Sequence, residues 1–81
     1  MLRAVEKLVQ AVRYGKKKAT CGNHWMEVKD DVIKYYYHNT AVCIVNKNGQ
    51  VEYHNGNWNT SSTTRCIHSY MEIYGKGEIK E

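Results

Sequence analysis

The chain has no proline and no phenylalanine, and its three cysteines are an odd number. Without phenylalanine, seven tyrosines and two tryptophans must supply the aromatic part of the core. An odd cysteine count disfavours the paired disulfides of a small secreted domain, so we expect free thiols in a reducing compartment. No apolar run approaches the roughly 20 residues of a membrane span, and no signal peptide is recognisable. These absences predict a soluble intracellular protein without a membrane segment.

The sequence also lacks the motifs of common catalytic folds, namely the P-loop, GxGxxG, HExxH and paired carboxylates. Cys43 beside His54 has the chemistry of a nucleophile pair, but neither residue lies in an obvious reactive loop and nothing marks an oxyanion hole. A chain of 81 residues is also too short for a deep pocket of its own. We therefore expect a protein that is not an enzyme.

Two segments have the apolar spacing of amphipathic helices. Residues 2–14 carry an apolar side chain every three or four positions, and Gly15 is a typical helix stop. Residues 61–74 carry a second apolar stripe, and either Thr60 or Ser61 can cap that helix.

Between the helices, four segments rich in β-branched and aromatic residues predict strands: residues 24–28, 32–38, 40–46 and 50–55. Asn48-Gly49 predicts a tight hairpin turn, and residues 76–81 resemble a frayed tail. The expected fold is α+β, a single domain over residues 1–81 with the order α-β-β-β-(β)-α. Its antiparallel sheet has three to four strands, with the N-terminal and the C-terminal helix packed on one face.

Cysteine and histidine side chains are present in numbers that suit a zinc site. Cys21-x-x-His24 has a spacing typical of two zinc ligands, and Cys66 on the second helix is a third candidate. His68 is disfavoured, because side chains two positions apart on a helix point about 200° apart. The alternative is that the cysteines are small buried apolar residues.

The fourth zinc ligand would come from the predicted hairpin. With a two-residue turn at Asn48-Gly49, Cys43 lies opposite His54 on one face of the sheet, whereas a bulged three-residue turn would break that pairing. We expect the zinc to be structural. The candidate ligands are Cys21, His24, Cys66, Cys43 and His54.

Exposed aromatic and basic residues are the candidates for binding a partner. The net charge is +4, and the basic residues cluster at Arg13 and residues 16–18, where they could contact phosphates or simply be solvated at a helix end. Three consecutive tyrosines must place at least one ring away from the core. The candidate partner-binding residues are Tyr14, Lys16, Lys17, Lys18, Trp25, Tyr35, Tyr36 and Tyr37.

The segment from residue 37 to 67, YHNTAVCIVNKNGQVEYHNGNWNTSSTTRCI, resembles a motif of small phage-encoded proteins of uncharacterised function. The motif has a His-x-Thr, an apolar strand, a turn glycine, a second apolar strand, Gly-x-Trp-x-Thr-x-Thr-Thr and a helix. Ser62 stands where the motif often has threonine, and Cys66 where a basic residue is usual. The matching residues are His38, Thr40, Gly49, Gly56, Trp58, Thr60 and Thr63.

This resemblance implies a small accessory protein of a phage. A short chain with a Cys/His set is also similar to anti-CRISPR proteins, which mostly bind an effector complex and block a step without catalysis. In physical terms, the hydroxyl run after Trp58 can cap the second helix, and Trp58 itself can plug the open end of the sheet.

The expected function is therefore a phage-encoded, zinc-stabilised inhibitor in the cytoplasm of the bacterial host. Its partner is expected to be a bacterial defence protein, a type II CRISPR effector nuclease. The alternative is a small nucleic-acid-binding or phage regulatory module that uses Arg13 and Lys16–Lys18.

Overall fold

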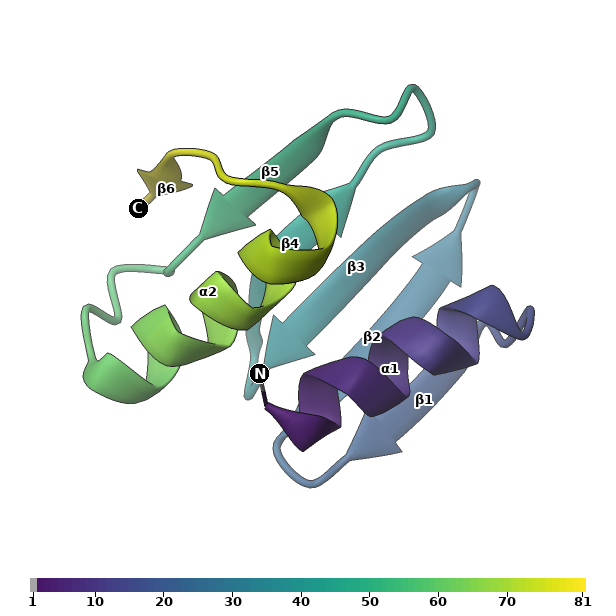
Figure 1. Ribbon diagram of the computed structural model, residues 1–81, viewed down its shortest axis with the longest axis horizontal. Helices are drawn as coiled ribbons and strands as arrows, with labels where there is room; N and C mark the ends of the chain where they lie inside the picture. Colours follow the sequence, from purple (N-terminus) through teal and green to yellow (C-terminus); the bar gives the residue numbers. More distant parts are fainter. Residues whose placement is uncertain (1) are drawn as a thin grey trace.

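A computed structural model describes residues 2–81, in which two helices and six strands form one α+β unit (Figure 1). The α+β class and the flanking helices agree with the sequence prediction, but the sheet has six strands rather than three or four. The elements are α1 (Arg3–Arg13), β1 (Lys18–Cys21), β2 (His24–Lys29), β3 (Val32–Tyr37), β4 (Thr40–Val45), β5 (Val51–His54), α2 (Ser61–Tyr74) and β6 (Ile79–Lys80).

The sheet follows the chain in the order β1-β2-β3-β4-β5-β6, antiparallel as far as β5, with β6 parallel to β5. Both helices lie on the same face of this sheet, α1 over β1 and β2 and α2 over β4 and β5 (Figure 1). No other element of residues 2–81 covers the opposite face. We call that uncovered surface the open face.

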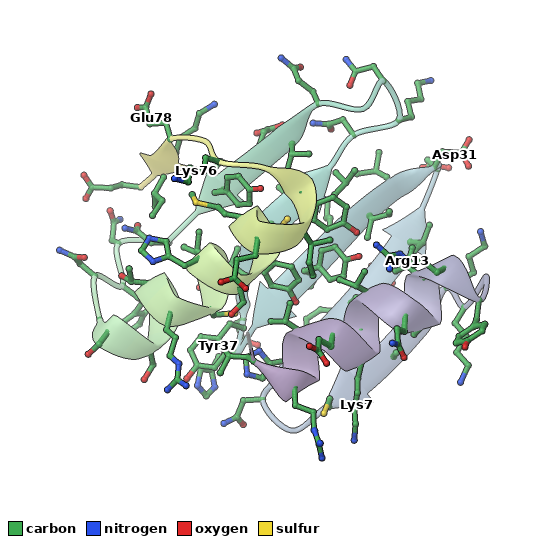
Figure 2. The ribbon with its side chains drawn as sticks, in the orientation of Figure 1. Lys7, Arg13, Asp31, Tyr37, Lys76 and Glu78 are labelled. Carbon is green, nitrogen blue, oxygen red and sulfur yellow. The ribbon has the colours of Figure 1, made fainter. Side chains whose placement is uncertain are left out.

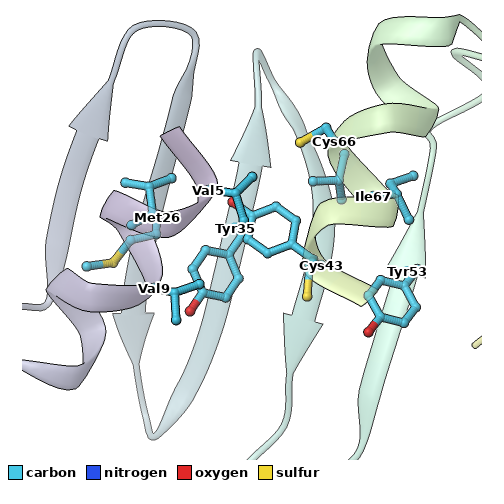
Figure 3. Packing of buried hydrophobic residues seen from close by; sticks show 11 residues of the cluster. Val5, Val9, Met26, Tyr35, Cys43, Tyr53, Cys66 and Ile67 are labelled. Carbon is cyan, nitrogen blue, oxygen red and sulfur yellow. The ribbon is translucent and has the colours of Figure 1, made fainter. Parts of the chain in front are cut away.

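The core is one row of side chains across the sheet beneath the two helices. Met26, Tyr35, Cys43 and Tyr53 are register partners on successive strands, and all four are buried. Figure 3 shows this row against Val5, Val9, Cys66 and Ile67 of the helices. Tyrosine thus replaces the missing phenylalanine, as the composition predicted.

Tyrosine can fill this core because its hydroxyls find polar partners beside α2. The Tyr53 hydroxyl donates to the Gly75 carbonyl at 2.6 Å, and the Tyr35 and Tyr74 hydroxyls are 2.5 Å apart. Among the buried side-chain oxygens and nitrogens of residues 2–81, only the Tyr70 hydroxyl has no hydrogen-bond partner. A buried hydroxyl without a partner destabilises the folded state.

The substitution Tyr70→Phe should therefore raise the free energy of unfolding by about 1 kcal/mol, because it removes a desolvated hydroxyl and leaves the ring packed. Tyr35→Phe is the matched control, and it should lower the free energy of unfolding by about 1 kcal/mol through loss of the bond to Tyr74. Urea denaturation followed by circular dichroism measures both. Destabilisation by Tyr70→Phe would show that this hydroxyl has a partner in solution.

The β4–β5 turn differs from the predicted two-residue turn. The Asn46 amide donates to the Gln50 carbonyl at 2.8 Å, which leaves residues 47–49 as a three-residue turn. Gly49 has a φ of 91°, in the left-handed region that such turns require, and the Asn48 side chain accepts a hydrogen bond from the Gln50 amide. The extra turn residue shifts the register, so Cys43 lies opposite Tyr53. The predicted Cys43–His54 pair is wrong.

A bulge on β4 changes which side chains face the core. Tyr35 pairs with Cys43, but Tyr36 pairs with Ala41, so Val42 is an extra residue on that strand. Val42 and Cys43 are consequently both buried, although neighbours on a regular strand face opposite sides.

The two strands that the sequence did not predict lie at the edges of the sheet. β1 is a short strand with exposed residues at alternate positions. The tail expected to fray instead returns beside β5, where Ile79 packs against the core and the Asn55 amide donates to the Lys80 carbonyl. None of the helices described within residues 2–81 is long and apolar enough to cross a membrane.

Candidate functional site

The β3–β4 turn lies where the open face meets a hollow at the start of α2. His38 has a φ of 56°, so the left-handed conformation reverses the chain between Tyr37 and Thr40. Tyr37 lies at one end of the molecule, and Arg13 and Asp31 lie toward the other (Figure 2). We call the region around this turn the His38 end.

A cavity of about 450 Å³ lies at the His38 end. The β3–β4 turn forms one wall, and the segment before α2 together with the first turn of α2 forms the other. The lining residues are Tyr37, His38, Asn39, Thr40, Trp58, Thr60, Ser62 and Thr63.

The segment before α2 follows a path that depends on a glycine. Gly56 has a φ of 59°, and a Cβ built there would lie 2.8 Å from the Thr40 Cγ2 atom. The Asn55 side chain and carbonyl accept hydrogen bonds from the Asn57 and Trp58 amides, which form a tight turn. Glycine therefore allows this turn to rest directly on the first residue of β4.

The start of α2 is capped as the hydroxyl run predicted. Thr60 is the N-cap, and its side chain accepts from the Thr63 amide at 3.2 Å and donates to the Thr63 hydroxyl at 3.0 Å. The prediction that Trp58 plugs the end of the sheet is wrong, because its side chain is 63% exposed. Trp58 lines the cavity instead, and its backbone amide donates to the Asn55 carbonyl.

An aromatic pair occupies the open face beside the same turn. Trp25 and Tyr36 are register partners whose rings stack at 3.7 Å with an interplanar angle of 2°. The Trp25 Nε1 donates to the His38 carbonyl at 2.7 Å, which fixes the indole against the turn. The row continues on either side with small residues, Thr20 on β1 and Ala41 on β4. The pair is half-buried, and its neighbours along the row are small.

The next row on the open face has charges of both signs. Lys18, Glu27, Lys34, Ile44 and Glu52 are successive register partners. The Lys18 Nζ lies 3.5 Å from a Glu27 carboxylate oxygen. The Glu52 carboxylate accepts from the Asn46 amide group, which holds the pKa of that carboxyl below its usual range. The row has no net excess of either sign.

Of the predicted zinc ligands, the structure brings His24 and Cys66 together. The Cys66 Sγ and the His24 Nδ1 are 3.7 Å apart, and the imidazole lies 4.8 Å from the Tyr37 ring. Burial raises the pKa of the Cys66 thiol to about 12, and burial followed by the charge of His38 lowers the pKa of His24. Both groups are neutral at pH 7, so this thiol is not an activated nucleophile.

The other predicted ligands do not complete a metal-binding group with this pair. Cys43 is buried in the core, where burial raises the pKa of its thiol to about 12, and His54 bonds to Glu52 at 3.2 Å. Cys21 faces His24 across the β1–β2 turn. Within residues 2–81, no three or more His, Cys, Asp or Glu side chains form a group that could hold a metal ion. His68 is exposed on α2, as expected.

The lowered pKa of His24 makes stability depend on pH. The unfolded chain binds a proton near the ordinary pKa of 6.5, whereas the folded chain binds it only at lower pH. Stability from this group is thus present above pH 6.5 and is lost as the pH falls toward the folded-state pKa. We expect His24→Gln to flatten the fall in melting temperature between about pH 7.5 and pH 5, while the exposed control His68→Gln leaves it unchanged. An unaltered pH profile for His24→Gln would contradict this.

The predicted partner-binding residues divide between the core, the cavity, the open face and the segment at the end of α1. The prediction for Tyr35 is wrong, because its side chain is fully buried, and Tyr37 lines the cavity. Trp25 and Tyr36 are on the open face. Tyr14 is 82% exposed at the C-terminal end of α1, followed by the exposed Lys16, Lys17 and Lys18, away from the His38 end.

Most residues of the phage motif converge on the cavity. His38, Thr40, Trp58, Thr60 and Thr63 line it, and Gly56 contacts Thr40. In comparisons with known proteins, no family model, no curated protein and no solved structure matched this chain.

Proposed function

We propose that this chain is a non-catalytic binding protein that recognises another protein through its open face, centred on the Trp25–Tyr36 pair. The observation that carries the proposal is this stacked pair, which stands on an uncovered sheet between two small residues. Tryptophan and tyrosine are the side chains most often found at the energetic centre of protein interfaces. The pair is also rigid before binding, since the Trp25 indole is hydrogen-bonded to the His38 carbonyl.

The surroundings of the pair favour a protein over a nucleic acid. A protein interface typically has an aromatic centre and a polar rim of both charge signs, whereas a nucleic-acid surface has an excess of positive charge. The Lys18–Glu27–Lys34–Ile44–Glu52 row has the mixed character. Of the basic residues of the alternative function, Arg13, Lys16 and Lys17 lie away from the pair, whereas Lys18 belongs to the mixed-charge row beside it.

The resemblance to phage proteins names the class of partner to test first. The protein would act as a phage-encoded inhibitor that binds a bacterial defence protein, and a type II CRISPR effector nuclease is the proposed target. The experiment mixes the purified chain with such a nuclease and follows both complex formation and DNA cleavage. We expect a stable complex and reduced cleavage. Full cleavage with no complex would reject this partner.

Salt dependence separates the protein partner from the nucleic-acid alternative. Binding through the open face should weaken by less than about tenfold between 50 and 200 mM salt, whereas four phosphate contacts from Arg13 and Lys16–Lys18 would weaken nucleic-acid binding by about 10²-fold. The double substitution Lys16→Glu, Lys17→Glu, which leaves Lys18 of the open face in place, should leave the protein affinity almost unchanged. Binding to a nucleic acid that is lost on that substitution would instead support the small nucleic-acid-binding or regulatory module.

The zinc ion is a separate hypothesis about stability. On this fold it would require Cys21 to join His24 and Cys66 across the β1–β2 turn. Elemental analysis of protein purified without a metal-binding tag tests it. One zinc per chain, lost together with the fold on Cys21→Ser, would support a structural ion. If the purified protein holds no metal, Cys66 and His24 form only a contact between two neutral side chains.

A further inference from the structure

The cavity at the His38 end has a chemically distinctive wall. Its volume of about 450 Å³ is within the range of small-molecule sites in proteins. Three of its lining side chains are aromatic rings, and the other five carry hydroxyl or amide groups. None of the lining residues is Lys, Arg, Asp or Glu. Such a wall fits an uncharged group with a flat face and a hydrogen-bonding edge.

The Trp58 indole is the flat surface available to that group. It is 63% exposed, while Trp25, the other tryptophan, is stacked on Tyr36 and hydrogen-bonded. The Trp58 backbone that carries the indole is fixed by the turn around Asn55, and Gly56 lies close to Thr40. The rings of Tyr37 and His38, 4.4 Å apart, form the opposite wall.

The polar lining supplies both hydrogen-bond donors and acceptors. The Asn39 amide can donate and accept side by side, and the Thr40 and Ser62 hydroxyls can do either. Paired donors and acceptors of this kind match the edge of a nucleobase, as in the bidentate contact of asparagine with adenine. Bases that are not paired in a duplex are commonly held by stacking on aromatic side chains.

We propose that this cavity binds one unpaired nucleobase, stacked on Trp58 and hydrogen-bonded by its edge to Asn39 and the neighbouring hydroxyls. The base can come from a free nucleoside or nucleotide, or from an unpaired position of a single strand. A base inside a duplex is excluded because its faces are already stacked. This site is distinct from the proposed protein-binding pair on the open face.

Calorimetric titration of the full chain with adenosine tests the site. We expect binding at millimolar adenosine or below, and a roughly 5- to 150-fold loss on Trp58→Ala, the range measured when a stacking aromatic is removed. Tyr14→Ala is the control, since that ring is also exposed but lies away from the cavity, and it should leave the affinity unchanged. Amide resonances of Asn39, Thr40 and Ser62 should shift with adenosine. No heat and no shifts, or equal affinity in Trp58→Ala, would overturn the proposal.

Further ligands identify the source of the base. Tighter binding of a short single-stranded oligonucleotide than of adenosine, with a duplex inactive, would assign the base to a strand, and equal affinity would assign it to a free nucleotide. Binding of a neutral disaccharide in place of adenosine would overturn the nucleobase assignment. Tyr36→Ala should leave adenosine binding intact, so failure of the protein-partner proposal and failure of this one are distinguishable.

Discussion

Gly56→Ala is expected to lower the free energy of unfolding by about 2–5 kcal/mol, the sum of a left-handed backbone cost and of overpacking. The added methyl group would lie 2.8 Å from the Thr40 Cγ2 atom while the backbone keeps a φ of 59°. A domain of this length is stable by about 4–12 kcal/mol, so this is a large fraction of the total. Urea denaturation measures the change.

The chain provides a matched control for the backbone part of this effect. Gly22 has a φ of 62°, and a Cβ there would meet nothing within 4 Å. Gly22→Ala should therefore lower the free energy of unfolding by only about 1–2 kcal/mol. In the Gly56→Ala background, Thr40→Ala removes the clashing atoms and should recover about 1–3 kcal/mol. Equal losses for the two glycine substitutions would show that the segment before α2 does not rest on β4.

Tyr36→Ala is expected to weaken binding of the proposed protein partner by about 30-fold or more, equivalent to about 2 kcal/mol. The substitution removes half of the stacked pair and leaves the Trp25 indole without support on one face. Because the ring lies on the open face rather than in the core, the fold should lose only about 1 kcal/mol. Affinity for the nuclease, measured by calorimetry, gives the result directly.

The control for this experiment is Tyr14→Ala. That side chain is 82% exposed but lies away from the open-face pair, so its removal should change the affinity by less than about threefold. Trp25→Phe should retain most of the affinity, because it keeps a ring to stack on Tyr36. Binding that is lost equally with Tyr14→Ala and Tyr36→Ala would place the interface elsewhere on the molecule.

Local sequence alone determined the helices and most of the strands. The apolar stripes predict helices over residues 2–14 and 61–74, and the structure has Arg3–Arg13 and Ser61–Tyr74. The sequence predicts a cap at Thr60 or Ser61, because the helix start needs an acceptor for an unpaired amide, and the structure has it at Thr60. These features depend on side chains within a few residues of one another, so periodicity and capping rules are sufficient to find them.

Only the tertiary structure decided the register, the edges of the sheet and the candidate sites. One extra residue in the β4–β5 turn moved His54 away from Cys43, and the bulge at Val42 placed two neighbours in the core. β6 forms because the tail finds an unpaired edge of β5, which no local pattern in residues 76–81 encodes.

The cavity, too, forms only in the tertiary structure. Thr40 and Trp58 are far apart in the chain, and they meet because Gly56 permits a close contact between two segments. The sequence determined which side chains are available for recognition, whereas the packing of distant segments decided which of them share a surface.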